Sequence, residues 1–590
     1  MAHRRMIGFA AIAAVLASLP AAAQPAPRTN DAPGANSLIA YRSIFHPVEA
    51  ANGMVAAQEK IAAEVGRDIL KKGGNVVDAA VATGFALAVT HPQAGNLGGG
   101  GFMLIKFADR AEVIAIDYRE IAPAAATRDM FLNAAGEVDN NRARFSHLSA
   151  GVPGSVMGLT MALEKYGTMS RKEVMAPAIA LAEKGFPVSG ALGDAFDDYA
   201  ERFQRDPSTL AYFTRGGTPY AQGERFAQKD LARTLKAIAK SGAKGFYEGP
   251  VAGLIAAEMK ASGGLITLAD LAAYRAVERT AVAGKFRGYD VVSMPPSSSG
   301  GVHLIEMLNV LEGYDLASMG HNSADYLGLL VETMRRAYAD RSAYLGDPDF
   351  FDVPIAALTD AGYAAKLRAQ IDPRRATKSA DVAPGLGPVG ESEQTTHYSV
   401  MDKDGNAVAV TTTLNFIFGS SFSVDGAGFF LNNEMDDFSA KPGTPNGFGL
   451  LGGQANEVGP GKRPLSSMTP TIVIKDGKAI FATGTPGGST IINIVLQNVL
   501  NILEFGMNPM QANASPKIHH QWQPDRITAE PGISIDTIAI MEKRGFIFAR
   551  SENGALQQRP MGRTNTVMLH DGALLGAADP REPDSGVGAF

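Results

Sequence analysis

The chain has 590 residues, with 54 Lys and Arg against 60 Asp and Glu, 45% hydrophobic residues and no Cys. A net charge of −6 argues against a broad basic surface, so neither nucleic acid nor an anionic membrane is expected as a partner. The absence of Cys excludes a disulfide framework, an iron–sulfur cluster and a thiol nucleophile. At ~150 residues per domain the length predicts about four domains, with one large layered domain as the alternative.

The N-terminal segment has the three parts of a secretory signal. Basic residues at positions 3–5 precede an apolar run from Met6 to Leu19, and small residues follow at 21–23. The run is shorter than the ~20 residues that a membrane-spanning helix needs. We therefore predict a signal peptide over residues 1–23 and a periplasmic or secreted mature protein without a membrane anchor. A buried N-terminal helix is the alternative.

The next part of the chain has mostly helical periodicity. Ala-rich patterns predict helices from Met54 to Leu70 and from Val76 to Val89, and similar spacing recurs at 156–163 and 327–339. Residues 372–394 then lose all periodicity and concentrate Pro, Gly, Ser and charge. This composition predicts a loop or linker.

After this loop the sequence becomes rich in strands. Asp-Gly pairs at 404–405, 476–477 and 571–572 each predict a hairpin, and short β-branched runs such as 407–413 and 469–474 flank them. Helices early and strands late predict a layered α+β fold. The boundary near residue 394 need not separate two domains, because strands from both sides can share one sheet.

Several generic motifs are excluded by the residues around them. The Gly447–Gly452 segment matches GxGxxG, but Pro442 and Pro445 precede it where a dinucleotide-binding unit needs a strand. His519 and His520 are adjacent, so they lack the i, i+4 spacing of a helical metal site. We expect neither a metal nor an organic cofactor.

One hydroxyl residue, Thr395, stands where the predicted loop enters the first hairpin strand. A hydroxyl at such a junction can attack the preceding carbonyl and leave Thr395 as a new N-terminus. The free α-amine, with a reference pKa of ~7.7 to 8.0, would then act as the base for its own side chain. An ordinary sheet also uses Thr, so a purely structural role remains the alternative.

The hairpin register predicts a partner for that amine. If the turn centres on Asp404, Thr395 lies opposite Thr413, within one position. A second hydroxyl there would orient the amine.

A glycine-rich turn supplies a second candidate element. Residues 484–490 (GTPGGST) leave a predicted strand and enter a predicted helix near Ile491. Backbone N–H groups exposed there, at the positive end of a helix, can form an oxyanion hole. A plain glycine connector is the alternative.

These residues belong to a wider pattern that resembles the γ-glutamyltransferase (γ-glutamyltranspeptidase) family of the N-terminal-nucleophile hydrolase superfamily. The matching stretches run in family order from about residue 50 to the C-terminus. They are NLGGGGF at 96–102, DYRE at 117–120, TTHYS at 395–399, LNNEMDDF at 431–438, RPLSSM at 463–468 and PGG at 486–488.

The resemblance implies a four-layer αββα sandwich made from a precursor that cuts itself between Gln394 and Thr395. Residues 24–394 would form the large subunit and residues 395–590 the small subunit of a heterodimer. Thr395 is implied to be the nucleophile and Thr413 its supporting hydroxyl. Gly487 and Gly488 are implied to be the oxyanion donors.

The resemblance also implies how the γ-glutamyl head group is held. Arg119, Ser466 and Ser467 would bind its α-carboxylate, and Asn415, Glu434 and Asp437 its α-amine. Arg suits a carboxylate because it binds bidentately, and an acidic pair suits an ammonium group. Read without the resemblance, Arg119 predicts an exposed ion pair with Asp117 or Glu120, and residues 434–437 predict a solvated acidic turn.

The implied reaction transfers a glutamyl group from glutathione or another γ-glutamyl compound to water, an amino acid or a peptide. A related glutaryl or cephalosporin acylase and a polyglutamate-processing enzyme are the nearest rivals. An exported, catalytically silent binding protein is the rival from another class. Residues 441–453 resemble a lid loop in which Phe448 stands where Tyr is common, which bears on acceptor preference.

The predicted cut is tested by denaturing gel electrophoresis. We expect one precursor to give two associated fragments, residues 24–394 (371 residues) and 395–590 (196 residues). Thr395→Ala should give a single uncut band, because its side chain has no oxygen to attack the peptide bond. An uncut wild-type protein, or two bands from Thr395→Ala, would contradict this mechanism.

Overall fold

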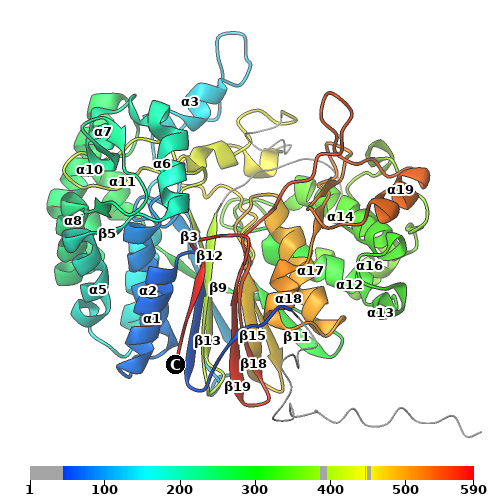
Figure 1. Cartoon of the computed structure of the whole chain (residues 1–590). Coiled ribbons are helices and arrows are strands. Elements are labelled where there is room, and N and C mark those ends of the chain that lie inside the picture. Colours follow the sequence, from blue (N-terminus) through cyan, green and yellow to red (C-terminus); the bar gives the residue numbers. More distant parts are fainter. Residues whose placement is uncertain (1–43, 386–394, 445–446, 448–452) are drawn as a thin grey trace, which may run out of the picture. The chain divides into compact units, whose positions relative to one another are not determined.

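Two antiparallel sheets, of seven strands each among the described residues, lie between two groups of helices (Figure 1). The computed structural model describes residues 44–385, 395–444, 447 and 453–590, and residues 45–590 form one unit. In spatial order sheet A contains β1 (Val48–Ala50), β19 (Ala573–Ala578), β18 (Asn565–His570), β15 (Lys478–Gly484), β14 (Thr471–Lys475), β11 (Tyr289–Ser293) and β10 (Val282–Phe286). Sheet B contains β20 (Gly586–Ala589), β2 (Gly53–Ala57), β12 (Thr396–Asp402), β13 (Ala407–Thr413), β3 (Gly100–Lys106), β4 (Val113–Tyr118) and β9 (Val277–Thr280).

One helical group shares a core with the outer face of sheet B. Its members are α1 (Lys60–Lys71), α2 (Val76–Thr90), α4 (Ser155–Tyr166), α5 (Arg171–Lys184), α6 (Gly190–Phe203), α7 (Pro207–Phe213), α8 (Lys229–Ser241), α9 (Lys244–Tyr247), α10 (Gly249–Ser262) and α11 (Leu268–Ala273). The short pairs β5 (Phe186–Pro187) with β8 (Arg225–Phe226) and β6 (Thr214–Arg215) with β7 (Thr218–Pro219) connect some of these helices.

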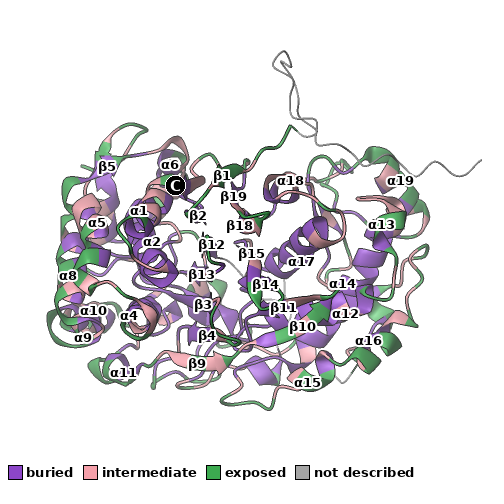
Figure 2. Cartoon of the chain, turned by 90° about the horizontal axis from the view of Figure 1, so that it is seen from below, coloured by how far each residue is buried: buried purple, intermediate pink, exposed green. Residues whose placement is uncertain are grey.

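The second group packs on sheet A. Its members are α12 (Gly300–Leu311), α13 (Leu316–Met319), α14 (Ala324–Tyr344), α15 (Ile355–Leu358), α16 (Ala361–Arg368), α17 (Thr490–Leu503), α18 (Pro509–Ala514) and α19 (Ile535–Lys543). The remaining elements are α3 (Asn140–Arg144), the pair β16 (Ile518–His519) with β17 (Thr528–Ala529), and the 3₁₀ turns η1 (His147–Ser149), η2 (Ser379–Asp381), η3 (Glu434–Asp437) and η4 (Gln454–Asn456). Figure 2 shows buried residues gathered along the sheets and exposed residues on the outer helices.

Side chains alternate across sheet B and separate its two faces. In β13, Val408 and Val410 enter the core shared with α1 and α2, whereas Ala407 and Ala409 face the core that contains sheet A. Alternation with period 2 is the geometry of a strand, and small side chains let two sheets pack closely. The predicted four-layer αββα sandwich is therefore confirmed.

The sharing of one sheet by both parts of the chain is also confirmed. The hairpin of β12 and β13 lies between β2 and β3, which come from far upstream. Every strand of this four-stranded centre is antiparallel to its neighbour. The expectation of about four domains is wrong, because residues 45–590 form one unit.

All three Asp-Gly hairpins are present, as β12–β13, β14–β15 and β18–β19. At the second turn Asp476 and Gly477 have φ of +50° and +81°. Two consecutive positive φ angles define the turn type that matches strand twist, which explains why Asp-Gly predicts it well.

The helical prediction for the first part of the chain is partly wrong. The stretch from Met54 begins as strand β2, and the helix starts only at Lys60. The same region also contains strands β3 and β4, which the helical periodicity did not predict. All seven residues of β3 are buried, so its sequence lacks the polar alternation that reveals a half-exposed strand.

The predicted loop at 372–394 is described as far as residue 385, where η2 is its one regular element. The signal peptide prediction and the Gln394 side of the predicted cut lie outside the described residues. Among the residues that are described, no helix is both long and apolar enough to cross a membrane.

A close backbone crossing fixes the end of β13. The amide of Asn96 donates from Nδ2 to the carbonyl of Thr413 (2.8 Å), and its Oδ1 accepts from Gly99 N (2.9 Å). A Cβ atom on Gly99 would lie 1.9 Å from the Thr413 carbonyl oxygen. Only glycine fits this crossing without moving the backbone.

Gly99→Ala should therefore lower the thermal unfolding midpoint by several degrees, because the strand carrying Thr413 must shift to relieve the clash. The matched control is Gly253→Ala in α10, where nothing lies within 4 Å of the added Cβ and helix propensity favours Ala. Equal midpoints for wild type and Gly99→Ala in a melting experiment would contradict the close crossing.

Candidate functional site

Thr395 lies one position before β12, at the wall of a cavity of about 580 Å³. Thr413, Asn415 and Gly487 line the same cavity. Ligand sites in proteins commonly have volumes of roughly 300–1,000 Å³. Four residues predicted from the sequence thus reach one space large enough for a small substrate.

The predicted register of the first hairpin is confirmed. Thr396 pairs with Thr412, and His397 pairs with Thr411. Continuing this register by one position places Thr395 opposite Thr413. The two hydroxyl residues therefore lie at the same end of two adjacent central strands of sheet B.

Gln58, which the sequence reasoning missed, anchors the start of β12. Its Oε1 accepts hydrogen bonds from the Thr396 hydroxyl and from His397 N (3.3 Å), and it also lines the cavity. The sequence carries no signal for this contact, because Gln58 is 338 positions from Thr396. The side chain fixes the backbone directly after Thr395.

His397 is a structural residue of this strand. Its ring nitrogens lie 2.8 Å from the Thr411 hydroxyl and 2.9 Å from the Ser399 hydroxyl. Burial lowers the pKa of His397 to about 3, so the imidazole is neutral at pH 7. It is also absent from the cavity lining.

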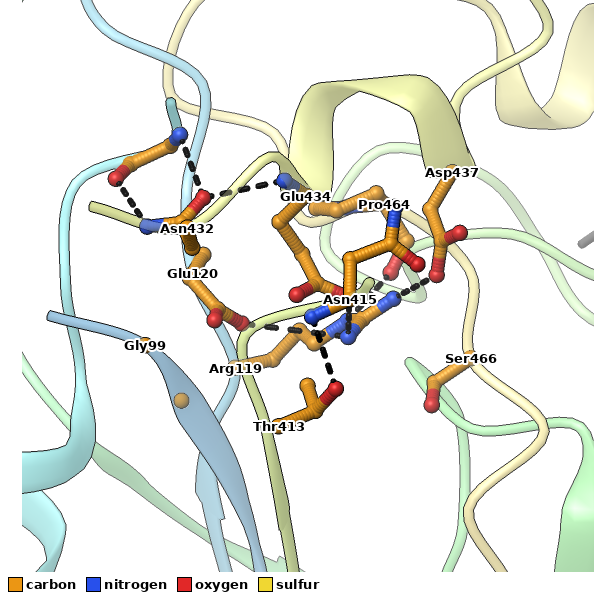
Figure 3. A network of polar contacts seen from close by, with 12 residues as sticks. Gly99, Arg119, Glu120, Thr413, Asn415, Asn432, Glu434, Asp437, Pro464 and Ser466 are labelled. Atoms are coloured by element: carbon orange, nitrogen blue, oxygen red, sulfur yellow. Dashed lines mark hydrogen bonds and ion pairs between the residues drawn. The ribbon is translucent and has the colours of Figure 1, made fainter. Parts of the chain in front are cut away.

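Asn415 connects the end of β13 to the acidic turn η3. Its backbone N–H donates to the Thr413 hydroxyl (2.8 Å), and its Nδ2 donates to the Asn433 carbonyl (2.9 Å). The residue has φ of +74°, a left-handed conformation that Asn tolerates better than most residues. The side chain is thereby held between the cavity and residues 433–437 (Figure 3).

The predicted glycine-rich turn connects β15 to α17. Gly487 and Gly488 both have positive φ, +131° and +64°. Gly487 lines the cavity, whereas Gly488 is absent from its lining. In the described part of the chain neither N–H donates to another group. The Gly487 N–H is therefore available to an oxygen in the cavity, and the role of Gly488 stays a prediction.

Arg119 directly follows β4 and is buried, at 1% exposure. Its guanidinium forms ion pairs with Glu434 and Asp437, and its Nε donates to the Pro464 carbonyl (3.1 Å) (Figure 3). The alternative is right about an ion pair with Glu120 (3.8 Å) but wrong about its exposure, because both side chains are buried. Arg119, which was predicted to bind the α-carboxylate of the substrate, thus pairs with Glu434 and Asp437, which were predicted to bind its α-amine.

The acidic turn is buried as well, so the alternative of a solvated turn is wrong. Burial raises the pKa of the Glu434 carboxyl well above its usual range, Arg119 opposes that rise, and the nearby Glu120 adds to it. Burial also raises the pKa of Glu120 to about 7. Asp436 pairs with Arg144 (2.9 Å) and not with Arg119, which separates it from Asp437.

Ser466 and Ser467 are buried beside this cluster. The Ser466 hydroxyl accepts from Met468 N (3.1 Å), and the Ser467 hydroxyl accepts from the guanidinium of Arg341. Arg341 also donates from Nε to the Ser299 hydroxyl (2.6 Å). The sequence reasoning missed Arg341, which holds the Ser466–Ser467 segment from α14.

The two adjacent histidines that were rejected as a metal site make contacts within the fold. Among the described residues no group of three or more His, Asp or Glu side chains is arranged to hold a metal ion. His519 faces Asn493 and His520 faces Asp525. Residues 448–452, which include Phe448 and most of the GxGxxG match, lie outside the described residues.

Comparison with solved structures identifies the class of protein. A cephalosporin acylase from Bacillus halodurans superposes with a TM-score of 0.81 at 27% identity, covering 93% of this chain and 98% of its own. A γ-glutamyltranspeptidase chain from Helicobacter pylori is 47% identical, with a TM-score of 0.55, and covers 55% of this chain and 94% of its own. The fold is that of an N-terminal-nucleophile hydrolase.

Sequence comparison identifies the family. Residues 62–589 match the family described as gamma-glutamyltranspeptidase, and the chain belongs to that family. A glutathione hydrolase proenzyme from Escherichia coli (strain K12) is 51% identical over 582 residues, 98% of each chain. An acylase ACY 1 proenzyme from Pseudomonas sp. (strain SE83) is 37% identical and covers 90% of this chain and 92% of its own. The recognition made from the motifs is thus confirmed.

The buried ion pairs predict how stability depends on pH. The folded-state pKa of Glu434 lies above the ~4.3 of an unfolded Glu, so this group costs stability as pH rises from about 4 through its folded pKa. Arg119 limits that cost. Arg119→Leu should therefore lower the unfolding midpoint little near pH 4 and much more at neutral pH, by ~3–5 kcal/mol in free energy.

Melting curves of Arg119→Leu across this pH range test the prediction. Arg128→Leu is the matched control, because Arg128 is 63% exposed and its ion pairs should contribute little. A loss in Arg119→Leu that is the same at pH 4 and pH 7 would contradict the buried charge cluster.

Proposed function

We propose that the mature protein is an exported γ-glutamyltransferase and glutathione hydrolase that matures by cutting its own precursor. The observation that carries the proposal is the buried cluster of Arg119, Glu434 and Asp437. These three residues do not line the cavity at Thr395, but Asn415, which does, bonds to the Asn433 carbonyl next to the acidic turn. A γ-glutamyl head group has one carboxylate and one ammonium. Arg119 complements the first charge, and the two carboxylates complement the second.

The internal ion pairs favour this zwitterion over a head group with one charge. When the head group binds, its carboxylate takes the place of an acidic side chain at Arg119, and its ammonium compensates the displaced acid. A glutaryl group brings no ammonium, so it would leave a buried carboxylate without a cation, and an uncompensated buried charge is strongly unfavourable. The cluster thus supports γ-glutamyl donors over the acylase alternative.

We propose that maturation uses the same hydroxyl as catalysis. The Thr395 Oγ attacks the carbonyl carbon of Gln394, and the peptide C–N bond breaks as the nitrogen takes a proton. Water then hydrolyses the resulting ester, which leaves a carboxylate at Gln394 and a free amine at Thr395. The products are the large subunit (24–394) and the small subunit (395–590).

In the catalytic reaction the free amine accepts the proton of the Thr395 hydroxyl, which attacks the γ-carbonyl of the donor. The N–H groups of Gly487 and Gly488 stabilise the oxyanion, and Thr413 orients the amine. The proton passes to the leaving nitrogen as the amide bond breaks, and a γ-glutamyl ester remains on Thr395. Water, an amino acid or a peptide then attacks the ester and releases Thr395. These steps need neither a metal nor an organic cofactor.

Two comparisons support processing and donor choice. The relative from Escherichia coli and one from Pseudomonas sp. (strain A14), 50% identical, are both named glutathione hydrolase proenzyme. The solved transpeptidase chain from Helicobacter pylori spans 55% of this chain with 94% of its own length. A chain of that share accords with one subunit of a processed precursor.

Paired donors that share one leaving group test the proposal. Wild type should hydrolyse a γ-glutamyl anilide at least about 100-fold more efficiently than the glutaryl anilide, because the site holds buried charges for the α-ammonium. Asp437→Asn should lower kcat/KM for the γ-glutamyl donor far more than for the glutaryl donor. Equal use of both donors by wild type would favour an acylase and contradict the proposal.

Asp436→Asn is the matched control for this experiment. It makes the same change one residue away, in a carboxylate that pairs with Arg144. Any general effect of altering the buried turn should affect both donors alike. A donor-selective loss in Asp436→Asn equal to that in Asp437→Asn would contradict the assignment of the ammonium site.

A further inference from the structure

The cavity at Thr395 continues beyond the predicted site residues to a strongly charged wall. The ionisable side chains there come from α6 and from the C-terminal part of the chain. They are Asp194, Asp198, Arg559, Arg563, Arg581 and Glu582. The reaction proposed above assigns no role to any of them.

Two of the three cations on this wall are already neutralised. Arg563 pairs with Glu582 (2.5 Å), and Arg581 pairs with Asp579 (2.6 Å). The guanidinium of Arg559 forms no ion pair and no hydrogen bond within the described residues. Arg559 is therefore the one lining cation in that part of the chain whose charge is not used by the fold.

Arg559 also belongs to a segment that contacts the candidate oxyanion turn. The segment 559–563 lines the cavity together with Gly487. A Cβ atom on Gly487 would lie 3.2 Å from the Cα of Gly562, so the two loops touch. The chain thus places Arg559 three residues from the point of contact with the candidate oxyanion turn.

The position of the head group fixes which part of a donor meets Arg559. The buried Arg119 cluster lies next to Thr413 and Asn415 (Figure 3). With the glutamyl head group there and the scissile amide at Thr395, the leaving group extends into the open cavity. Two peptide residues span at most ~7 Å, so a dipeptide leaving group carries its terminal carboxylate across this space.

We propose that Arg559 binds the C-terminal carboxylate of the leaving peptide and so selects donors by that end. This proposal rests on the γ-glutamyl activity proposed above. The carboxylates of Asp194 and Asp198, which line the same cavity and are exposed on α6, would disfavour a second acidic group. They would also stabilise the ammonium that the released amine becomes. The wall thus suits a zwitterionic peptide.

The test compares glutathione with two γ-glutamyl compounds that lack the terminal carboxylate, glutathione amidated at its C-terminus and a γ-glutamyl anilide. Arg559→Gln should lower kcat/KM for glutathione about tenfold or more, since a charge-assisted bidentate contact is lost. It should leave kcat/KM for the other two donors within about twofold of wild type. Wild type should itself use amidated glutathione about as poorly as Arg559→Gln uses glutathione.

The matched control is Arg526→Gln, which removes an exposed arginine that is absent from the cavity lining. An equal loss on all three donors in Arg559→Gln, or no loss on glutathione, would overturn the assignment. A wild-type protein inactive on the anilide would contradict the proposed function instead, so the two failures are distinguishable.

Discussion

The antiparallel pairing of β12 with β13 is the constraint on which the rest of the site depends. It places Thr395 and Thr413 at the ends of adjacent strands, and a slip of one residue would turn their side chains to the opposite face. The hairpin is hydrogen-bonded on one side to β2 and on the other to β3. A cut before Thr395 would therefore remove one covalent link and leave the sheet intact, which explains how two subunits can stay together.

The second constraint is electrostatic. Arg119, Glu434 and Asp437 are almost fully buried, and taking charges out of water costs more than their attraction usually returns. Such a cluster is poorly explained as a stabilising device. It is well explained as a site that keeps both signs of charge in place for a zwitterionic head group. Asn415 links the proposed head-group site to the end of β13, because it contacts Thr413 and the Asn433 backbone.

Local signals in the sequence predicted the parts that local geometry controls. Asp404-Gly405 fixed the hairpin register, and the glycines at 487–488 predicted a turn with exposed donors. Long-range contacts carried no such signal. The Gln58 anchor on Thr396, the Arg341 contact with Ser467 and the pairing of Arg119 with Glu434 each join residues more than 100 positions apart. The recognised motifs named some of these residues but not their mutual contacts.

The most direct measurement is mass spectrometry of the small fragment after the enzyme is mixed with a γ-glutamyl donor and quenched in acid. The account predicts that the peptide beginning at Thr395 gains the mass of one glutamyl group as an ester, and that hydroxylamine removes it. Glutamyl on any other residue, or turnover by a protein whose chain remains joined at Gln394–Thr395, would contradict the central role of Thr395.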